Sequence, residues 1–245
     1  MYNSIMTTKL VYMEDFDVTA CEAEVSKTEE FEGKQVVVLD QTCFYPKGGG
    51  QDFDQGKISS KDSVFKVEAV FFIEGEAKHM GEYEKGSFST GDKVDCKVDK
   101  SRRRLNTRIH SGGHVLDMAT RQLDWGWIPG KGAHYPHMAF VEYSGEYDGE
   151  QKQKYVTDLQ EKIDELISKG SKNSIEFMTP EAMKNTGAVV PKNLPKGKPT
   201  RVVFYDGFAV PCGGTHVKNI ADVGKLNVTN IKRKDGNIRV SYKIN

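Results

Sequence analysis

Two short segments of the chain carry histidine and cysteine at spacings that suit a metal site. Residues 110–114 read HSGGH, and on a helix two histidines at this spacing share one face, with Cβ atoms about 5–6 Å apart. Residues 212–216 read CGGTH, where glycines allow a tight turn that brings a thiolate and an imidazole together. Each segment alone is more often structural than functional. Together they supply three imidazoles and one thiolate, a set that suits zinc in a reducing compartment.

The number of candidate ligands leaves the role of such a metal open. His110, His114, Cys212 and His216 would make a closed structural site, whereas a catalytic zinc keeps one position free for water or substrate. One ligand could be replaceable, the coordination could expand, or the metal could only shape the site. Because the two segments lie far apart in the chain, the fold itself must bring them together.

The other histidines and cysteines have no such partners. His79, His134 and His137 lack a nearby ligand residue in the sequence, and we interpret them as surface or pocket residues. The remaining cysteines are well separated, which predicts free thiols that act as small apolar residues. They are Cys21, Cys43 and Cys96.

The elements that position these segments fall into two regions, and the sequence pattern of the first, residues 1–99, predicts a small β-barrel domain. Short apolar or alternating runs rich in valine and phenylalanine are separated by glycine-containing turns. The predicted strands span residues 35–41, 64–72 and 93–98. Several short strands with regular turns are typical of a small barrel or sandwich.

The second region, residues 100–245, predicts an α+β domain that holds both candidate metal segments. Asp99 or Ser101 caps a helix that runs to about Leu123, although Gly112 and Gly113 are unfavourable inside it. Helices segregated from strands give the fold class α+β. The other predicted elements are a helix over 155–167, a short helix opening at Thr179 and Pro180, a strand over 201–205 before Cys212, and a hairpin over 225–244.

Composition limits the classes of function. Lysine plus arginine equals aspartate plus glutamate, 35 each, so the net charge of zero argues against binding nucleic acid by bulk charge alone. Two local basic segments remain, three arginines at 102–104 and a run over 184–201 that contains lysines and no acidic residue. The N-terminus has no secretory signal and no stretch is long enough to span a bilayer. We therefore expect a soluble cytoplasmic protein that does not bind membranes.

The motifs resemble those of the AlaX family, which is similar to the editing domain of alanyl-tRNA synthetase and, more distantly, to that of threonyl-tRNA synthetase. The resemblance is carried by HSGGH with the VLD that follows it, by CGGTHV, and by the glycine-rich YPKGGGQ at residues 45–51. PGKG at 129–132 and VEY at 141–143 extend it over nearly the whole chain, in order. The sequence departs from the common synthetase form at residues 111–113, where threonine and alanine are more usual.

This resemblance implies a zinc-dependent aminoacyl-tRNA deacylase that removes serine, and also glycine as a possible second substrate, from alanine tRNA. The zinc would be held by His110, His114, Cys212 and His216. No class II synthetase catalytic domain precedes the motifs, so we expect a freestanding editing protein that does not charge tRNA itself. The oligomeric state is not predicted.

The resemblance also suggests roles around the metal. Ser111 and Thr215 are candidates for reading the serine hydroxyl, with capping of the local backbone as the alternative. Gln51 either approaches the amino acid or terminal adenosine, or is an ordinary loop glutamine. Glycines without side chains permit close backbone approach to a ligand. They are Gly48, Gly49 and Gly50.

The transfer RNA would be held by basic residues. Lys131 is a candidate contact to the acceptor end. Candidate phosphate contacts are Arg102, Arg103, Arg104, Lys192, Lys196 and Lys198.

Two other functions stay open. One is a serine-specific deacylase acting on threonine tRNA, and the other is a zinc-stabilised RNA-binding module without activity. A metalloprotease fits less well, because no glutamate follows His110 as a general base.

Overall fold

A computed structural model describes residues 7–189 and 199–245. Three of the candidate phosphate contacts, Lys192, Lys196 and Lys198, lie outside the described residues. The chain groups into two compact units. Unit 1 comprises Met1–Gly48 and Asp52–Arg104, and unit 2 comprises Gly49–Gln51 and Leu105–Asn245.

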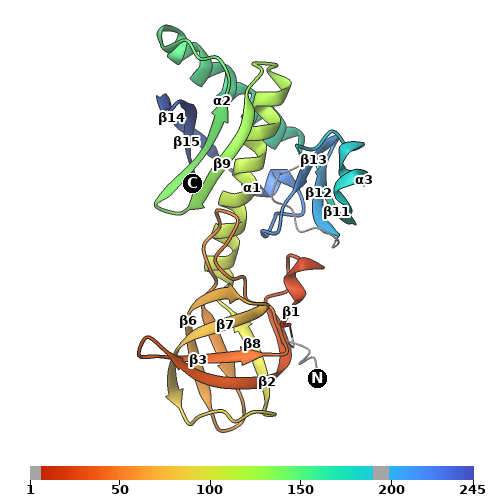
Figure 1. Ribbon diagram of the computed structural model, residues 1–245. Coiled ribbons are helices and arrows are strands. Elements are labelled where there is room, and N and C mark those ends of the chain that lie inside the picture. The colour runs from red at the N-terminus through yellow and green to blue at the C-terminus, as the bar shows by residue number, and fades with distance from the viewer. Residues whose placement is uncertain (1–6, 190–198) are drawn as a thin grey trace. The chain divides into compact units, whose positions relative to one another are not determined.

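Unit 1 is built on a closed barrel whose strands follow the order β2-β3-β7-β6-β5-β8 (Figure 1). Neighbouring strands pair antiparallel around the ring, and closure leaves no open sheet edge. The strands are β2 (Ala20–Phe31), β3 (Lys34–Leu39), β5 (Gly56–Ser59), β6 (Val64–Ile73), β7 (Glu76–Lys85) and β8 (Lys93–Val98). A short parallel pair, β1 (Lys9–Leu10) with β4 (Gln41–Thr42), and the 3-10 turn η1 (Val11–Met13) complete the unit.

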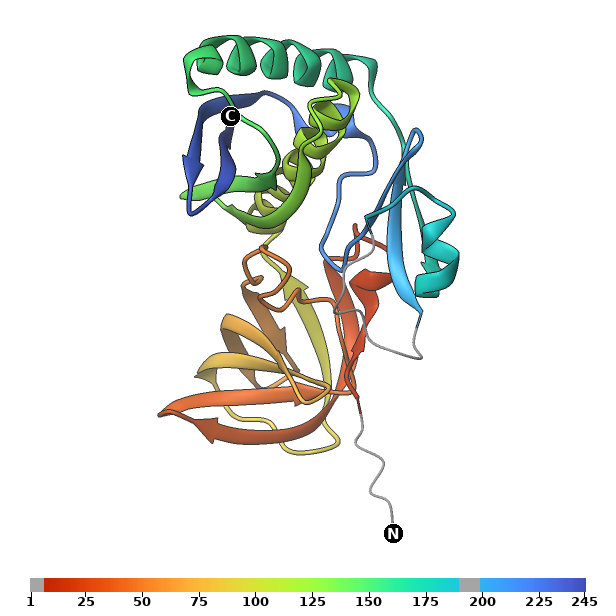
Figure 2. The same ribbon diagram turned by 45° about the horizontal axis from the view of Figure 1, so that its top comes forward.

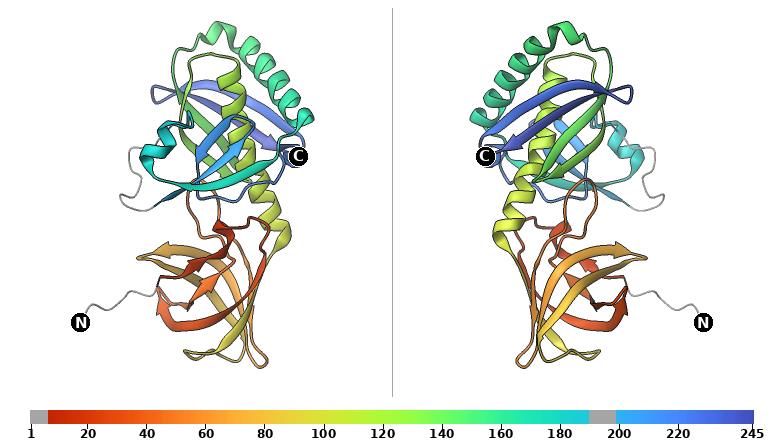
Figure 3. Two further views of the ribbon diagram at one scale, coloured as in Figure 1. Left: turned by 90° about the vertical axis from the view of Figure 1, so that its right-hand side faces the viewer. Right: turned by 90° about the vertical axis from the view of Figure 1, so that its left-hand side faces the viewer.

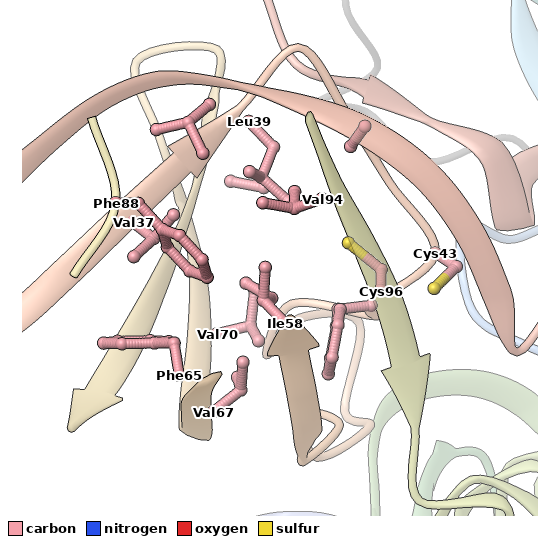
Figure 4. Close-up of a cluster of buried hydrophobic side chains, with 14 of the residues drawn as sticks. Val37, Leu39, Cys43, Ile58, Phe65, Val67, Val70, Phe88, Val94 and Cys96 are labelled. Carbon is pink, nitrogen blue, oxygen red and sulfur yellow. The ribbon is translucent and has the colours of Figure 1, made fainter. Parts of the chain in front are cut away.

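The barrel interior is filled by apolar side chains that alternate along the strands (Figure 4). On β8, the buried Val94, Cys96 and Val98 alternate with exposed residues, the period expected when one face of a strand is buried. The free thiols of Cys43 and Cys96 lie in this core, and Cys21 packs against it. This placement agrees with the interpretation of these cysteines as small apolar residues.

His79 is fully buried in unit 1, so its interpretation as a surface or pocket residue is wrong. Its Nδ1 lies 2.9 Å from the carbonyl oxygen of Val37, and its Nε2 lies 2.8 Å from Thr42 Oγ1. Because a carbonyl can only accept, Nδ1 carries the proton and Nε2 accepts from the hydroxyl of Thr42. Burial lowers the pKa of His79 to about 4, so the imidazole is neutral.

Unit 2 contains a four-stranded sheet in the order β14-β15-β10-β9. The strands are β9 (Ile128–Tyr135), β10 (Met138–Ser144), β14 (Leu226–Lys234) and β15 (Asn237–Ile244). The last two form the predicted hairpin, and Asp235 and Gly236 turn the chain with φ of 50° and 81°. The part of helix α1 that belongs to unit 2 lies along one face of this sheet (Figure 3).

Helix α1 (Lys100–Gln122) begins where the sequence predicted. Of the two candidate caps, Asp99 is the one used, because its Oδ1 accepts from the backbone N–H groups of Ser101 at 2.9 Å and Arg102 at 3.1 Å. The helix carries residues 110–114 in its interior, which places His110 and His114 on one face.

The two glycines inside α1 are explained by close packing. A Cβ on Gly112 would lie 3.0–3.2 Å from side-chain atoms of Leu226, Ile244 and Tyr242 on the hairpin. A Cβ on Gly113 would lie 2.3 Å from the ring of His134 on β9. The helix therefore accepts two poor helix formers so that its backbone can approach the sheet.

The remaining elements of unit 2 surround this core. Helix α2 (Lys152–Lys169) follows the turn η2 (Gly149–Gln151) and runs beside β14, where Gln160 bonds backbone groups of Leu226 and Val228 (Figure 2). A three-stranded sheet, β11-β12-β13, carries α3 on its flank. Its strands are β11 (Asn173–Met178), β12 (Thr200–Tyr205) and β13 (Phe208–Pro211). In the chain, α3 (Pro180–Lys184) follows β11, and the turn η3 (Ile220–Val223) comes after β13.

The predicted fold class, α+β with an N-terminal barrel, is confirmed. Thr179 caps α3 through its side chain and Pro180 opens it, as the sequence indicated. In the described parts of the chain, no helix has the length and apolar character of a membrane span.

Candidate metal centre

Four side chains from the two motif segments converge in unit 2. His110 and His114 project from α1, and Cys212 and His216 lie in the loop that follows β13. One ligand atom from each residue lies within 4.8 Å of the corresponding atom of every other. The fold thus brings the two segments together as the sequence analysis required, and the four groups could hold a metal ion.

The cluster is buried and crowded. His110, His114 and His216 are 1%, 7% and 0% exposed. The ring centroid of His110 lies 5.2 Å from that of His114 and 4.9 Å from that of His216, while Cys212 Sγ lies 3.3 Å from His110 Nε2. Both ring nitrogens of His114 are buried without a hydrogen-bond partner among the described residues. Such nitrogens are costly, and a bound metal would satisfy them.

The electrostatics of the cluster favour metal-ligating protonation states at most positions. Burial, then the neighbouring histidines, hold the pKa of His110 well below its usual range, and burial followed by His114 does the same for His216. Burial is the largest influence on Cys212 and raises its pKa, but His114, the backbone N–H of Gly214 and the charge of Arg201 together leave the pKa below its ordinary value. Neutral imidazoles and a thiolate are the forms that bind a metal.

The surroundings of His114 differ from those of the other two histidines, because a carboxylate and a thiol lie close to it. Burial opposes its charge, but Asp117 and Cys212 outweigh burial and raise the pKa of His114 to about 9. Asp117 Oδ2 lies 3.6 Å from His114 Nδ1, longer than a hydrogen bond, and Asp117 Oδ1 accepts from the hydroxyl of Tyr143 at 2.8 Å. A carboxylate held behind a histidine is a common outer neighbour of a protein metal site.

His134 lies against this cluster, although the sequence offered it no partner. Its ring is stacked on His110 with centroids 4.8 Å apart and planes inclined by 14°. Tyr242 donates its hydroxyl to the carbonyl of Ile109, so His134 Nδ1 donates to Tyr242 Oη at 2.7 Å. Burial, followed by the charge of His114, lowers the pKa of His134 to about 3. The signal in the sequence that could have indicated a neighbouring ring was Gly113, because a glycine on α1 leaves room for the imidazole of His134.

Two predicted substrate-binding residues have protein partners. Ser111 and Thr215 are 1% and 0% exposed. Ser111 Oγ accepts from the backbone N–H of Val217 at 3.0 Å. Thr215 Oγ1 accepts from Gln51 Nε2 at 2.9 Å and lies 2.7 Å from Thr107 Oγ1. Both hydroxyls therefore help to position the loop after β13.

The glycine-rich segment is divided between the units. Gly48 belongs to unit 1, where its carbonyl accepts from the hydroxyl of Tyr45 at 2.8 Å. Gly49, Gly50 and Gln51 belong to unit 2 together with the metal-ligand candidates. Lys131 is exposed on β9 of the same unit.

The arginines at 102–104 have different surroundings, and the predicted phosphate contact by Arg103 is wrong. Arg103 is 3% exposed and forms an ion pair with Asp54, while its guanidinium also donates to the carbonyl of Cys43. These bonds leave it unable to reach a phosphate in solvent. Arg102 is partly buried and paired with Asp52 at 2.6 Å, and Arg104 is exposed.

Arg201, at the end of the second basic segment, is also buried. It is 1% exposed, its Nε donates to the carbonyl of Cys212 at 2.9 Å, and it bonds the carbonyl of Gly214. The guanidinium therefore holds the backbone of the CGGTH loop. Its charge also favours the thiolate of Cys212.

A cavity of about 430 Å³ reaches Asp117 but is lined by none of the four clustered residues. Apolar side chains, among them Trp127, Ile128 and Phe208, form much of its wall.

Two family models match separate parts of the chain. The model described as tRNA synthetases class II (A) matches residues 2–102, and the model described as the threonyl and alanyl tRNA synthetase second additional domain matches residues 200–241. The second match includes Cys212 and His216.

Curated relatives match over most of the chain. An alanine–tRNA ligase of Methanobrevibacter smithii is 29% identical over 250 residues, which cover 96% of this chain and 27% of the relative. An alanine–tRNA ligase of Delftia acidovorans is 30% identical over 214 residues, which cover 86% of this chain and 24% of the relative. The chain thus spans about a quarter of the length of these relatives.

Proposed function

This chain is an AlaX-like relative of the editing domain of alanyl-tRNA synthetase, and we propose that it is an aminoacyl-tRNA deacylase. The reaction is hydrolysis of the ester that joins a wrongly attached amino acid to alanine tRNA, with serine as the main substrate and glycine as a further one. The observation that carries the proposal is the convergence of His110, His114, Cys212 and His216 within 4.8 Å, in the motifs on which the resemblance rests.

Zn²⁺ is the metal that we propose for this cluster. A thiolate with three imidazoles is a donor set that zinc prefers, and the ring nitrogens of His114, which have no hydrogen-bond partner among the described residues, fit a bound cation. Zn²⁺ bound there would supply Lewis-acid polarisation of the ester carbonyl or of a water molecule. The chain's own contribution is a buried, rigid set of donors that excludes bulk water. Gln51, Thr215 and Arg201 hold the backbone and rings around it.

Serine must be separated from alanine by its hydroxyl. A site that hydrogen-bonds a substrate hydroxyl rejects the analogue without it by roughly 10⁴–10⁵-fold. Ser111 and Thr215 remain our candidates for this contact, although their present partners favour a role in holding the loop. Serine-over-alanine discrimination that is unchanged in both Ser111→Ala and Thr215→Val would remove them.

Contacts to the tRNA are proposed for exposed basic residues. Lys131 and Arg104 are exposed, and Lys192, Lys196 and Lys198 stay candidates from the sequence. Replacing the three lysines with glutamine should make the slope of the logarithm of the binding constant against the logarithm of salt concentration less steep. The slope should change by up to about 0.7–0.9 for each phosphate that is no longer neutralised. An unaltered slope would exclude these lysines. We further propose the cytoplasm as the place of action and keep residues 1–99 and 100–245 as proposed domains.

The test is deacylation of alanine tRNA charged with serine, glycine or alanine by zinc-loaded protein. Release of serine well above the spontaneous rate, with alanine retained, is the expected result. The double variant His114→Ala, Cys212→Ala should lose this activity. His137→Ala is the matched control, because His137 is exposed and stacks only against the ring of Tyr135 in the described ring contacts.

Serine-charged threonine tRNA is the second substrate to assay, because the matched family model describes both synthetases. Cleavage of that ester alone would show that the protein is a deacylase of serine-charged threonine tRNA. No cleavage of any ester by a folded, zinc-loaded protein would leave a metal-stabilised RNA-binding module.

A further inference from the structure

Gln51 is locked in place within unit 2 by backbone contacts. The backbone N–H of His134 donates to the carbonyl of Gly50 at 2.8 Å, and Gln51 forms a parallel bridge with His134. Gly50 has φ of +77°, and a Cβ there would lie 2.7 Å from the carbonyl oxygen of Gly132, so only glycine fits. These contacts therefore fix the backbone of residues 49–51 in a single register beside β9.

The side chain of Gln51 is 0% exposed and makes three hydrogen bonds. Its Oε1 lies 3.0 Å from the backbone nitrogen of Thr215 and 2.7 Å from His110 Nδ1, and its Nε2 donates to Thr215 Oγ1 at 2.9 Å. A backbone N–H can only donate, so the atom facing it must be the amide oxygen. This contact fixes the orientation of the whole amide.

The orientation of the amide in turn fixes the tautomer of His110. Because Oε1 is an acceptor, His110 Nδ1 must carry the proton that it donates. The lone pair of His110 is then on Nε2, the atom that lies 3.3 Å from Cys212 Sγ inside the cluster. Thr215 stands one residue before His216, so the same amide also anchors the second ligand segment.

We propose that Gln51 is a positioning residue of the metal centre, which holds His110 in the Nδ1–H tautomer and directs its Nε2 to the metal. This role deepens the proposed function, since it rests on the metal site assigned there, and it replaces the substrate contact expected for Gln51. Loss of such an outer partner typically costs about 10–100-fold in metal affinity. A glutamine that only fills space would not show this effect when replaced by a side chain of equal size.

The experiment compares three proteins: the wild type, Gln51→Met and Gln51→Glu. Methionine matches the length of glutamine but offers no strong acceptor to His110, whereas glutamate keeps an acceptor oxygen. Co²⁺ affinity, measured from its visible absorption in competition with a chelator, should fall about 10–100-fold in Gln51→Met. In Gln51→Glu it should stay within about threefold of wild type or rise, because a carboxylate increases the basicity of its histidine partner.

Equal affinities in all three proteins would overturn the proposal, as would equal losses in both variants, which would indicate packing alone. Thr107→Val is the control, because it removes the hydrogen bond of Thr107 with Thr215 but none with His110. Should Gln51→Met fail to fold, Gln51→Asn, whose shorter amide falls short of His110, takes its place.

A second readout does not depend on metal or on activity. In metal-free protein, ¹⁵N chemical shifts of the His110 ring should report the Nδ1–H tautomer in the wild type and a mixture in Gln51→Met. A mixed tautomer in the wild type would refute the assignment. Normal tautomer and metal results in a protein without deacylase activity would instead refute the proposed function and leave the role of Gln51 intact.

Discussion

Each unit of the molecule buries histidine, but in opposite surroundings. His79 in the barrel has a carbonyl acceptor on one ring nitrogen and a hydroxyl donor on the other. His114 in unit 2 is buried to a similar degree and has no hydrogen-bond partner on either ring nitrogen among the described residues. The first histidine is satisfied by the fold alone. The second is surrounded by other ligand-type groups, which raises the energy of the metal-free state.

The difference shows how a structural histidine can be told from a ligand. Burial alone does not separate them, because both are nearly inaccessible to solvent. Hydrogen bonding does: both ring nitrogens of His79 have a partner, whereas neither ring nitrogen of His114 has one among the described residues. A buried histidine whose ring nitrogens lack partners and lie among other ligand-type groups is one whose nitrogens a metal ion would satisfy.

The largest effect is expected from removing a ligand. His114→Ala should weaken Zn²⁺ affinity by more than the roughly 10–100-fold that loss of an outer partner costs, whereas His79→Gln should leave it unchanged. Competition with a chromophoric chelator measures both. Equal zinc affinity in wild type and His114→Ala would break the distinction between the two histidines.

The buried ion pair of the barrel should come next. Arg103→Leu leaves the carboxylate of Asp54 buried without its cation and should lower the free energy of unfolding by about 3–5 kcal/mol. Urea unfolding of wild type and variant measures this, with Arg102→Leu as the more exposed control, for which a much smaller loss is expected. A variant as stable as the wild type would mean that Asp54 is protonated or solvated, as burial alone would favour.

The pH dependence of the barrel follows from His79. Its folded pKa of about 4 lies below the ordinary value, so the stability due to the neutral ring is present above pH 6.5 and is lost as the pH falls through 4. The full loss is about 3 kcal/mol. The unfolding free energy of His79→Gln should fall less between pH 7 and pH 4 than that of the wild type. Parallel pH profiles would show that His79 does not remain neutral.

The smallest effect is expected at the glycine pair of α1. Gly112→Ala gains helix propensity of up to about 1 kcal/mol but meets Leu226, Ile244 and Tyr242 at 3.0–3.2 Å, and such overpacking costs about 1–3 kcal/mol. We expect a net loss of about 1 kcal/mol in thermal or urea unfolding, whereas Gly149→Ala, which meets no atom within 4 Å, should show no such packing loss. A gain in stability in Gly112→Ala would mean that the hairpin can give way at this position.

Local patterns predicted the elements that are periodic. Helix α1, helix α2 and the final hairpin could be predicted because each has a signal within its own short stretch of sequence. These signals are the apolar spacing of the helices, the capping residue Asp99 and the Asp235–Gly236 turn. Strand β9 was missed, because IPGKGAHY has two glycines, a proline and no regular apolar alternation. It is a strand because β10 and the 49–51 tripeptide supply its partners.

The candidate site divides in the same way. The four ligand residues sit in two compact motifs, so their types and spacing could be read directly. The hydrogen bonds of Gln51 to His110 and Thr215 join residues 59 and 164 positions apart. A local sequence pattern spans only a few residues, so it cannot predict such contacts. The burial of Arg103 was hidden for the same reason, since its partner Asp54 lies 49 positions away.

The assignment of Gly49–Gln51 to unit 2 determines how the protein can be dissected. The chain passes from one unit to the other at three points, after Gly48, after Gln51 and after Arg104. A fragment that starts at Leu105 would therefore lack three residues of its own unit, including the only glutamine bonded to His110 among the described residues. A faithful minimal version of unit 2 would need these residues restored, for example as a tethered peptide, before its metal chemistry could represent that of the whole chain.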